Sequence, residues 1–585
     1  MVKKFFGAFA LLVVPAAFSN AQEGAFNDLL QPMRSFVSFK NNFETGINQG
    51  ADLTPGQGGN GTAALESIGG NNVYALSQTG EYFHFELKSF KLPPEGVGQY
   101  VDVDFDLTAE AGVKENLQLT LRNQSQTLGG IFGNGGIVTI PTDAMTKTVH
   151  VHFHRYLDGF NWDNDSYMSV DVPWWMTSIL GGGSYNDNAK IRIDNLRVTF
   201  PKRLAGVSRI TGTTDKNLGT ITFSNDGTTL GTYNNWFQNL GNVNFIDVFG
   251  RTNFGFDSDA KASSGLLYAK SNGSTDGLVM QRFSGTLDSI SNASWVGSGF
   301  ANGGVDRYYG IQADANNSGQ QYLFRQNLNN GVYRHTVRCL SDSFYYGNEM
   351  DVDLGGEELV AVADVNGDGK DDFVTRYGTT FRFRLFAGNT GTNPNRTIQL
   401  SEPIQVTNHN GYLKVLAVED INGDGNDDLL LLDQMNGHVY AGFCSSTGLS
   451  LDWLFTLNSS NGTFFEGILA FADADNDGLP DIYTTRYNSG VGQFEVDIRK
   501  VDTSNASNAQ ISSYTRLAMY DQSYHTPCSV GDVNGDGSAD VVFVTDDSQQ
   551  NQLSTFLTDP ATRTLLGSPH WIASARGSYL RPIFK

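Results

Sequence analysis

The sequence has few cysteines and few basic residues for its length. Its three cysteines, Cys339, Cys444 and Cys528, form an odd set, so at least one is unpaired and disulfides are not expected to hold the fold. Lysine and arginine number 39 against 62 aspartate and glutamate residues, and the formal net charge is −23. We therefore expect no nucleic-acid partner, because phosphate binding needs clustered basic side chains.

The sequence also lacks an apolar segment of the length that a membrane span requires, which is about 20 residues. An apolar run at 5–14 follows Lys3 and Lys4 and precedes the small residues at 19–21, a pattern typical of a secretory signal peptide over 1–21. Residues 22–35 are expected to be a loose leader. These features predict an exported monomer, secreted, periplasmic or on the cell surface, with no membrane span.

Common catalytic motifs are missing as well. The chain has no nucleophile elbow of the Gly-x-Ser-x-Gly type, no zinc-protease helix and no phosphate-cradling loop in a workable position. These absences favour a non-catalytic protein, and a polysaccharide lyase is the alternative.

Glycine and aromatic residues are abundant, and they favour an all-β protein with many turns. There are 66 glycines and 12% aromatic residues, while only 17% of residues are charged. Short alternating strands separated by glycine-rich turns predict a β-sandwich over 36–200. Its ends, at 43–46 and 193–199, resemble the first and last strands of jelly-roll carbohydrate-binding modules.

Four acidic segments share one pattern, with side-chain oxygens at positions 1, 3, 5 and 9 and glycine at position 6. We call them the first to fourth acidic turns, and they cover residues 364–372, 420–428, 473–481 and 532–540. Ca²⁺ binds oxygen atoms of carboxylates, amides and backbone carbonyls, and glycine permits the sharp turn. The sequence therefore predicts about four Ca²⁺ sites, with position 7 contributing its carbonyl. The expected ligands are Asp364, Asn366, Asp368, Lys370, Asp372, Asp420, Asn422, Asp424, Asn426, Asp428, Asp473, Asp475, Asp477, Leu479, Asp481, Asp532, Asn534, Asp536, Ser538 and Asp540.

The acidic turns are not EF-hands. An EF-hand needs glutamate at position 12, whereas these segments carry threonine, leucine or phenylalanine there and continue as short apolar strands. The alternative is an Asp- and Gly-rich β-turn that binds nothing. Four copies with one spacing favour Ca²⁺.

The acidic turns mark a repeat of roughly 50 residues. Weaker relatives of the pattern begin at Asp314, Asp257 and Asp215, and the first two are expected to be metal-free, because Ser318 and Lys261 stand at their position 5. Seven such units, each long enough for four strands, predict a seven-bladed β-propeller over 207–585.

The repeat resembles the FG-GAP/VCBS blades of bacterial secreted propellers and of the integrin α-subunit head. The resemblance implies that each acidic turn joins the first and second strands of a blade, with the Ca²⁺ ligands given above. It also implies that the last four of seven blades carry the complete turn. The C-terminal segment 577–584 resembles the lead-in to a first strand and is expected to return to the first blade.

Two groups of side chains are candidate ligand sites. Arginines and aromatics are expected on the propeller face opposite the acidic turns, where they suit an acidic polysaccharide. Their alternative is polar hairpin tips and packing between blades. Exposed indoles among Asp and Asn, at 156–175, suit sugar rings, with a core or domain interface as the alternative. The candidates are Arg325, Arg376, Tyr377, Arg486, Tyr487, Trp162, Trp174 and Trp175.

Three histidines alternate along one predicted strand. His150, His152 and His154 share a face, so neighbouring imidazoles could bind Zn²⁺ or Cu²⁺. The favoured interpretation is a polar strand that faces solvent.

Three functions follow from these patterns. The first is a non-catalytic, Ca²⁺-stabilised module that binds a glycan or a surface protein. The second is a polysaccharide lyase or another carbohydrate-active enzyme, with Arg376–Tyr377, Arg486–Tyr487 or His525 near the substrate. The third is a structural cell-surface or matrix protein that binds other proteins. Fold alone does not select among them.

Overall fold

The computed structural model describes a chain built from β-strands. The described residues are those of β1 to β45, bounded below, and the following positions outside the strands: 43, 69–70, 110, 144, 147–148, 330–331, 349, 353–357, 364–371, 378–379, 385, 401–403, 420–427, 434–437, 446–447, 457, 473–480, 503, 509, 532–534, 536–539 and 557–559. Within them there is no α-helix, so the all-β prediction is confirmed. No helix in this described part is long and apolar enough to cross a membrane.

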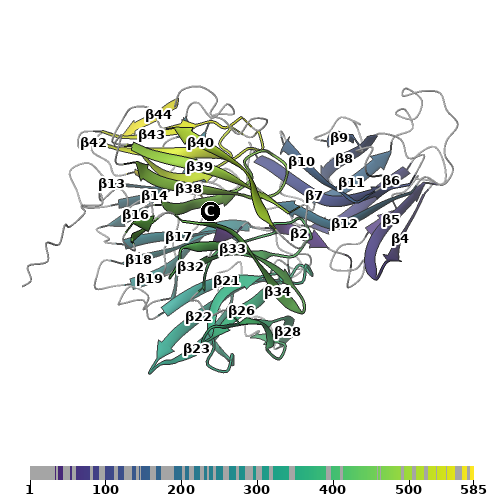
Figure 1. Ribbon diagram of the computed structural model, residues 1–585, viewed down its shortest axis with the longest axis horizontal. Helices are drawn as coiled ribbons and strands as arrows, with labels where there is room; N and C mark the ends of the chain where they lie inside the picture. Colours follow the sequence, from purple (N-terminus) through teal and green to yellow (C-terminus); the bar gives the residue numbers. More distant parts are fainter. Residues whose placement is uncertain are drawn as a thin grey trace, which may run out of the picture.

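The N-terminal part forms two antiparallel sheets, which we call the N-terminal unit (Figure 1). One has the order β10-β7-β12-β5-β4, and β2 pairs with β12. Its strands are β2 (Val37–Asn41), β4 (Gly61–Ile68), β5 (Asn71–Gln78), β7 (Gln99–Ala109), β10 (Val149–Leu157) and β12 (Lys190–Thr199). The other has the order β3-β6-β11-β8-β9. Its strands are β3 (Leu53–Pro55), β6 (Phe83–Phe90), β8 (Asn116–Asn123), β9 (Gly135–Thr139) and β11 (Ser166–Val172).

Alternation along β7 explains how the N-terminal unit divides its side chains. Phe105 and Leu107 are buried in the core of the unit. Because successive strand residues point to opposite faces, Asp104 and Asp106 point away from that core. The register places His152 of β10 opposite Asp104, so these polar side chains share the outer face of the sheet.

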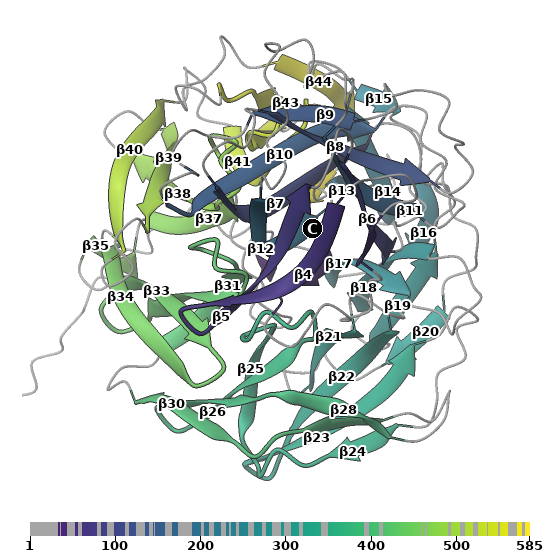
Figure 2. The ribbon, with the colours of Figure 1, turned by 90° about the vertical axis from the view of Figure 1, so that its right-hand side faces the viewer.

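Seven sheets follow in chain order, and Figure 2 shows the later ones succeeding one another around the molecule, with the N-terminal unit across one face. The first contains β13 (Leu204–Arg209), β14 (Lys216–Phe223), β15 (Leu230–Thr232), β16 (Trp236–Gly241) and β45 (Leu580–Phe584). The second contains β17 (Phe245–Phe254), β18 (Ser263–Ser271), β19 (Asp276–Arg282) and β20 (Ser294–Gly297). The third contains β21 (Asp306–Asp314), β22 (Gln320–Asn329), β23 (Val332–Leu340) and β24 (Met350–Val352).

The last four sheets carry the acidic turns. The fourth contains β25 (Glu358–Ala363), β26 (Asp372–Tyr377), β27 (Thr380–Arg384) and β30 (Ile404–Asn408), beside a hairpin of β28 (Phe386–Thr390) and β29 (Thr397–Leu400). The fifth contains β31 (Leu413–Glu419), β32 (Asp428–Asp433), β33 (His438–Ser445) and β34 (Gly448–Thr456), followed by a hairpin of β35 (Ser459–Ser460) and β36 (Thr463–Phe464). The sixth contains β37 (Glu466–Ala472), β38 (Asp481–Asn488), β39 (Gln493–Asp502) and β40 (Gln510–Ala518). The seventh contains β41 (His525–Gly531), β42 (Asp540–Asp547), β43 (Gln550–Phe556) and β44 (His570–Ala575).

Apolar side chains fill the space between neighbouring sheets. One cluster joins Leu430 of the fifth sheet to Phe471 and Ile482 of the sixth. Others join the third sheet to the fourth, the fourth to the fifth and the sixth to the seventh. Full burial of one such side chain contributes about 1.5–3 kcal/mol. Apolar packing therefore joins the third to seventh sheets, each to the next one in the chain.

Both ends of the described chain add strands to these sheets. The C-terminal β45 pairs with β13 of the first sheet, as expected from the segment 577–584. The two-residue strand β1 (Met33–Arg34) lies in the predicted leader. It pairs in parallel with β31 of the fifth sheet. The predicted leader thus ends in a short strand that is paired with the fifth sheet.

The unit that begins at Asp215 differs from the prediction. The β45 strand contacts β41, the first strand of the seventh sheet, so β45 takes the first-strand place in its own sheet. The connection from β13 to β14 then joins second and third strands, and the Asp215 segment is not equivalent to the acidic turns. The weaker turns that begin at Asp257 and Asp314 lie mainly outside the described residues.

Candidate metal centres

Each acidic turn joins the first strand of its sheet to the second, as the resemblance implies. The position-1 aspartate curls the turn, because its Oδ2 accepts the N–H of the position-6 glycine at 2.7–3.0 Å in all four turns. Those glycines have φ between 80° and 88°, a conformation that side chains disfavour. Both the hydrogen bond and the glycine conformation are therefore local to the turn.

The position-9 aspartate anchors the turn to its sheet. In the first turn, Asp372 Oδ2 accepts the N–H of Val365 at 3.2 Å and Oδ1 accepts the N–H of Phe386 at 2.7 Å. Asp428 and Asp540 accept the equivalent pairs of N–H groups at 2.7–3.1 Å. Each carboxylate oxygen keeps a second lone pair for another partner.

The third turn has an orphaned oxygen. Asp481 is 2% exposed, and its Oδ2 has no hydrogen-bond partner. Beside it, oxygen atoms of Asp473, Asp475 and Asp477 lie within 4.8 Å of one another. An unpaired buried carboxylate oxygen is costly, and hard oxygen donors are what Ca²⁺ prefers. The donor set therefore fits Ca²⁺.

Burial and mutual repulsion perturb the carboxylates of the turns. Burial, reinforced by neighbouring aspartates, holds the pKa values of Asp372, Asp428 and Asp540 well above their usual range. Burial likewise raises the pKa of Asp473 to about 7 and that of Asp481 to about 8. A cation in each turn would offset this repulsion and favour the ionised carboxylates.

Neighbouring turns are linked by backbone hydrogen bonds. The N–H of Asp427, at position 8 of the second turn, donates to the carbonyl of Asp364 in the first turn at 2.8 Å. Ala539, at position 8 of the fourth turn, donates to the carbonyl of Asp473 in the third turn at 2.7 Å. Position 8 of the third turn is Pro480, which has no N–H to donate.

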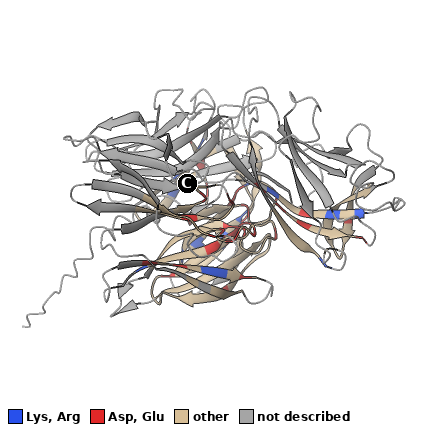
Figure 3. Cartoon of the chain, turned by 90° about the horizontal axis from the view of Figure 1, so that it is seen from above, with Lys and Arg blue, Asp and Glu red and all other residues tan. Residues whose placement is uncertain are grey.

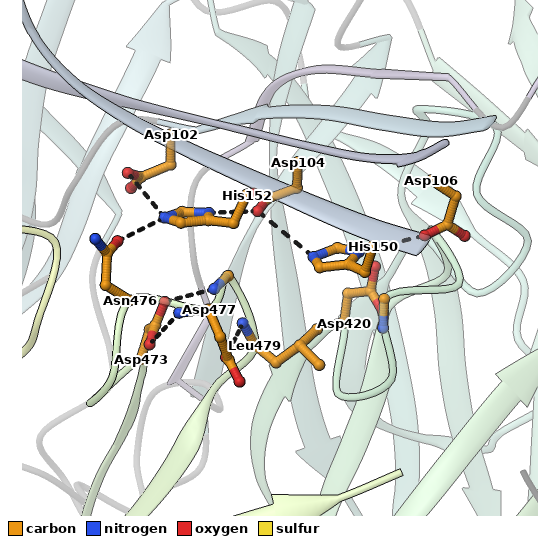
Figure 4. A network of polar contacts seen from close by, with 12 residues as sticks. Asp102, Asp104, Asp106, His150, His152, Asp420, Asp473, Asn476, Asp477 and Leu479 are labelled. Atoms are coloured by element: carbon orange, nitrogen blue, oxygen red, sulfur yellow. Dashed lines mark hydrogen bonds and ion pairs between the residues drawn. The ribbon is translucent and has the colours of Figure 1, made fainter. Parts of the chain in front are cut away.

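The outer face of the N-terminal unit lies directly on the second and third turns. Figure 3 shows aspartate and glutamate residues gathered where the two parts meet. His152 Nε2 lies 2.8 Å from Asn476 Oδ1, at position 4 of the third turn, and its Nδ1 lies 2.6 Å from Asp104 Oδ1 (Figure 4). His150 Nδ1 lies 3.3 Å from Asp106 Oδ1. The interpretation of a solvent-facing strand is therefore wrong for these two histidines, and His154 lies outside the described side chains.

Carboxylates set the charge of both histidines. Burial alone would lower the pKa of each imidazole, but the hydrogen bonds and charges of Asp104 and its neighbours raise both pKa values to about 10. The two imidazoles are therefore cationic at neutral pH. Each pairs with carboxylates instead of sharing a metal with the other.

Arg197 of β12 makes a further polar contact between the two parts. It is buried, and its Nη2 lies 3.4 Å from Glu419 Oε2, next to the second turn. The charges of Asp420 and Asp427 also stabilise the guanidinium and raise the pKa of Arg197 against the effect of burial. Arg197 therefore brings one positive charge to an acidic surface.

Gly478 illustrates how closely the two parts approach. A Cβ there would lie 2.8 Å from His152 Nδ1 and would overlap Asp104 Oδ1. Gly478→Ala is therefore expected to destabilise the folded protein by about 1–3 kcal/mol for overpacking, in addition to the strain of its positive φ. Urea unfolding in the presence of chelator measures this loss without a contribution from metal binding.

Gly378→Ala is the matched control for this prediction. Gly378 has φ +63° and nothing within 4 Å of an added Cβ, so only the cost of the conformation, about 1–2 kcal/mol, is expected. Equal losses in the two variants would contradict a tight contact at Gly478.

Three arginines proposed for ligand binding are engaged within the protein. Arg376 is buried, pairs with Glu358 and donates to the carbonyl of Leu413 at 3.0 Å. Arg325 pairs with Glu349 at 3.3 Å. Arg486 donates from Nε to Glu495 Oε2 at 2.5 Å.

Of the aromatic candidates for ligand binding, the structure describes the side chain of Tyr377 alone. Tyr377 is exposed, and the Arg382 guanidinium lies 5.1 Å from its ring centre. Trp162, Trp174 and Trp175 lie outside the described residues, as does the side chain of Tyr487. Their role in ligand binding stays a prediction.

Cys444 is buried and forms no disulfide bond.

Sequence reasoning missed the contact between the two parts. Arg197, Asp104 and Asn476 were not singled out, although they form this contact. One signal was present, because Asp102, Asp104 and Asp106 alternate on one strand as His150 and His152 do on another. Matched alternation of opposite charges on two strands indicates a shared polar face.

Searches with protein-family models and among curated proteins find no match. Solved structures similar to the chain include the CBM22-1 xylan-binding domain from Paenibacillus barcinonensis Xyn10C, at 12% identity and TM-score 0.20, covering 29% of this chain and 96% of that domain. A family 11 carbohydrate-binding module from Clostridium thermocellum has 16% identity and TM-score 0.19, with coverages of 27% and 92%. A protein from Lactobacillus plantarum has 11% identity and TM-score 0.36, with coverages of 66% and 99%. At these TM-scores no function is transferred to this chain.

Proposed function

We propose that the protein is an exported, Ca²⁺-binding β-propeller protein that acts as a non-catalytic glycan-binding or adhesion module. The observation that carries the metal part is the third turn, where the buried Asp481 oxygen has no partner beside three converging carboxylates. The first, second and fourth turns repeat its spacing, its glycine conformation and its buried position-9 aspartate.

The proposal of a closed propeller has separate support. Seven sheets follow one another in the chain, apolar cores lie between several neighbouring pairs, and β45 pairs with β13 of the first sheet. A ring of several small sheets leaves only short sheet edges exposed, and short edges limit pairing with the strands of other chains.

Residues at positions 1, 3, 5 and 9 of the four turns would hold the ions, together with the position-7 carbonyls. Bound Ca²⁺ would supply positive charge that keeps the acidic turns together. In this proposal the metal is structural, because a ligand that binds only the folded form stabilises it by mass action. Export would place the turns where calcium is abundant enough for weak, extracellular-type sites.

The non-catalytic form of the function is supported by the arginines. A lyase acting on acidic glycans needs an arginine or a Ca²⁺ ion to neutralise the substrate carboxylate. Arg376 and Arg486, the candidates for that role, pair with Glu358 and Glu495. The glycan itself is proposed from the indoles among Asp and Asn at 156–175.

Replacing two of these indoles tests the glycan proposal. The double variant Trp174→Ala/Trp175→Ala is expected to weaken binding to a glycan identified on an array by roughly tenfold or more, because each aromatic stacking contact contributes about 1 kcal/mol. Trp453→Ala is the control, since Trp453 is an exposed indole on β34, far along the chain from these two. Titration calorimetry measures both variants.

Other outcomes select the alternatives. Depolymerisation of a uronate glycan, followed as new absorbance from an unsaturated product, would replace the proposal with a lyase. Absence of both glycan binding and turnover would leave adhesion to a protein surface.

A further inference from the structure

Lys500 distinguishes the third acidic turn from the others. It lies on β39, and because the register pairs Ile482 with Arg499, Lys500 stands opposite Asp481. The registers of the fourth, fifth and seventh sheets place an apolar residue opposite each position-9 aspartate. These residues are Leu385, Phe443 and Leu557.

The ammonium group of Lys500 lies among the expected metal ligands. Its Nζ is 2.7 Å from Asp475 Oδ2 and also contacts Asp477 Oδ2. These carboxylates occupy positions 3 and 5 of the turn. Lys370 contacts the first turn too, but it reaches only one carboxylate, Asp368, at 3.3 Å.

We propose that Lys500 is a tethered competitor of Ca²⁺, which makes the third turn the weakest of the four sites. This inference rests on the proposed Ca²⁺ function. The ion can take the carboxylates of Asp475 and Asp477 only after the ammonium group leaves them. The third turn is therefore filled last as the calcium concentration rises.

The orphaned oxygen agrees with this arrangement. Lys500 contacts positions 3 and 5, whereas Asp481 Oδ2, at position 9, has no hydrogen-bond partner. An ammonium group is compact and offers three donors, so it does not satisfy a cage that suits six or more ligands. The turn thus keeps an affinity for Ca²⁺ that the lysine reduces without abolishing.

Stepwise Ca²⁺ titration of the chelator-stripped, full-length protein tests the proposal. For the wild type we expect three tighter binding steps and one that is weaker by about tenfold, since two partly exposed ion pairs must be broken. Lys500→Met is expected to bring the fourth step to within about threefold of the others. Lys500→Arg keeps the charge and is expected to retain the weak step.

Lys190→Met is the matched control, and it is expected to change no step by more than about threefold, because its partner Glu66 lies in the N-terminal unit. A wild type without any Ca²⁺ step would overturn the proposed function itself. Four equal steps in the wild type, unchanged by Lys500→Met, would overturn the role of Lys500 and leave the Ca²⁺ function standing. Circular dichroism of each variant excludes unfolding as the cause of a lost step.

Discussion

Removal of Ca²⁺ by a chelator is expected to lower the melting temperature of the protein by on the order of 10 °C. At a calcium concentration about tenfold above their Kd, the three tighter sites contribute about 1.4 kcal/mol apiece, and the weaker third site adds about 0.4 kcal/mol, so the total is roughly 5 kcal/mol. Without the ions, buried aspartates such as Asp428 and Asp540 repel neighbouring carboxylates when they are ionised, and this repulsion destabilises the folded protein. Differential scanning calorimetry measures the shift.

A chelator already saturated with Ca²⁺ is the control, and it is expected to leave the melting profile unchanged. Re-addition of Ca²⁺ should restore the original transition, because the ions bind the folded state. An identical melting temperature in calcium and in chelator would show that the acidic turns are ordinary β-turns that bind no stabilising ion.

Arg197→Met is expected to separate the N-terminal unit from the sheets that carry the turns. The variant leaves Glu419 buried beside Asp420 without the guanidinium, and loss of one partner from a buried ion pair costs about 3–5 kcal/mol. We expect a second, lower thermal transition and faster tryptic cleavage after Lys202 or Arg203, between β12 and β13. Calorimetry and timed proteolysis measure these effects.

Arg192→Met provides the matched control on the same strand. Arg192 pairs with Glu66 and Glu110, both within the N-terminal unit, and makes none of the contacts to the acidic turns described above. Its loss should lower stability modestly without accelerating cleavage between β12 and β13. Equal proteolysis of the two variants would mean that Arg197 does not hold the parts together.

The acidic turns could be predicted because their geometry is local. Within nine residues, the position-1 aspartate bonds the position-6 glycine, as Asp420 does with Gly425, so the spacing of oxygens and glycine is visible in the sequence itself. The repeat and its sheets follow from the spacing of the turns. The position-9 aspartate was also found, although its backbone partners on the third strand, such as Cys444, were not.

The contact between the two parts could not be predicted, because it joins residues far apart in the chain. His152 and Asn476 are separated by 324 positions, and Arg197 and Glu419 by 222. No local pattern specifies which face of a strand meets which turn. The candidate arginines differ in this respect, because Glu358, the partner of Arg376, is only 18 positions away and lies opposite it on the neighbouring strand.

Pro480 affects how neighbouring acidic turns are held together. Because proline has no N–H to donate, the second and third turns do not share the backbone hydrogen bond that joins the first turn to the second and the third turn to the fourth. The N-terminal unit contacts both of these turns, because His150 lies against Gly423 of the second turn and His152 lies against Gly478 of the third. The N-terminal unit thus adds side-chain contacts across the pair of neighbouring turns whose backbones do not share this hydrogen bond.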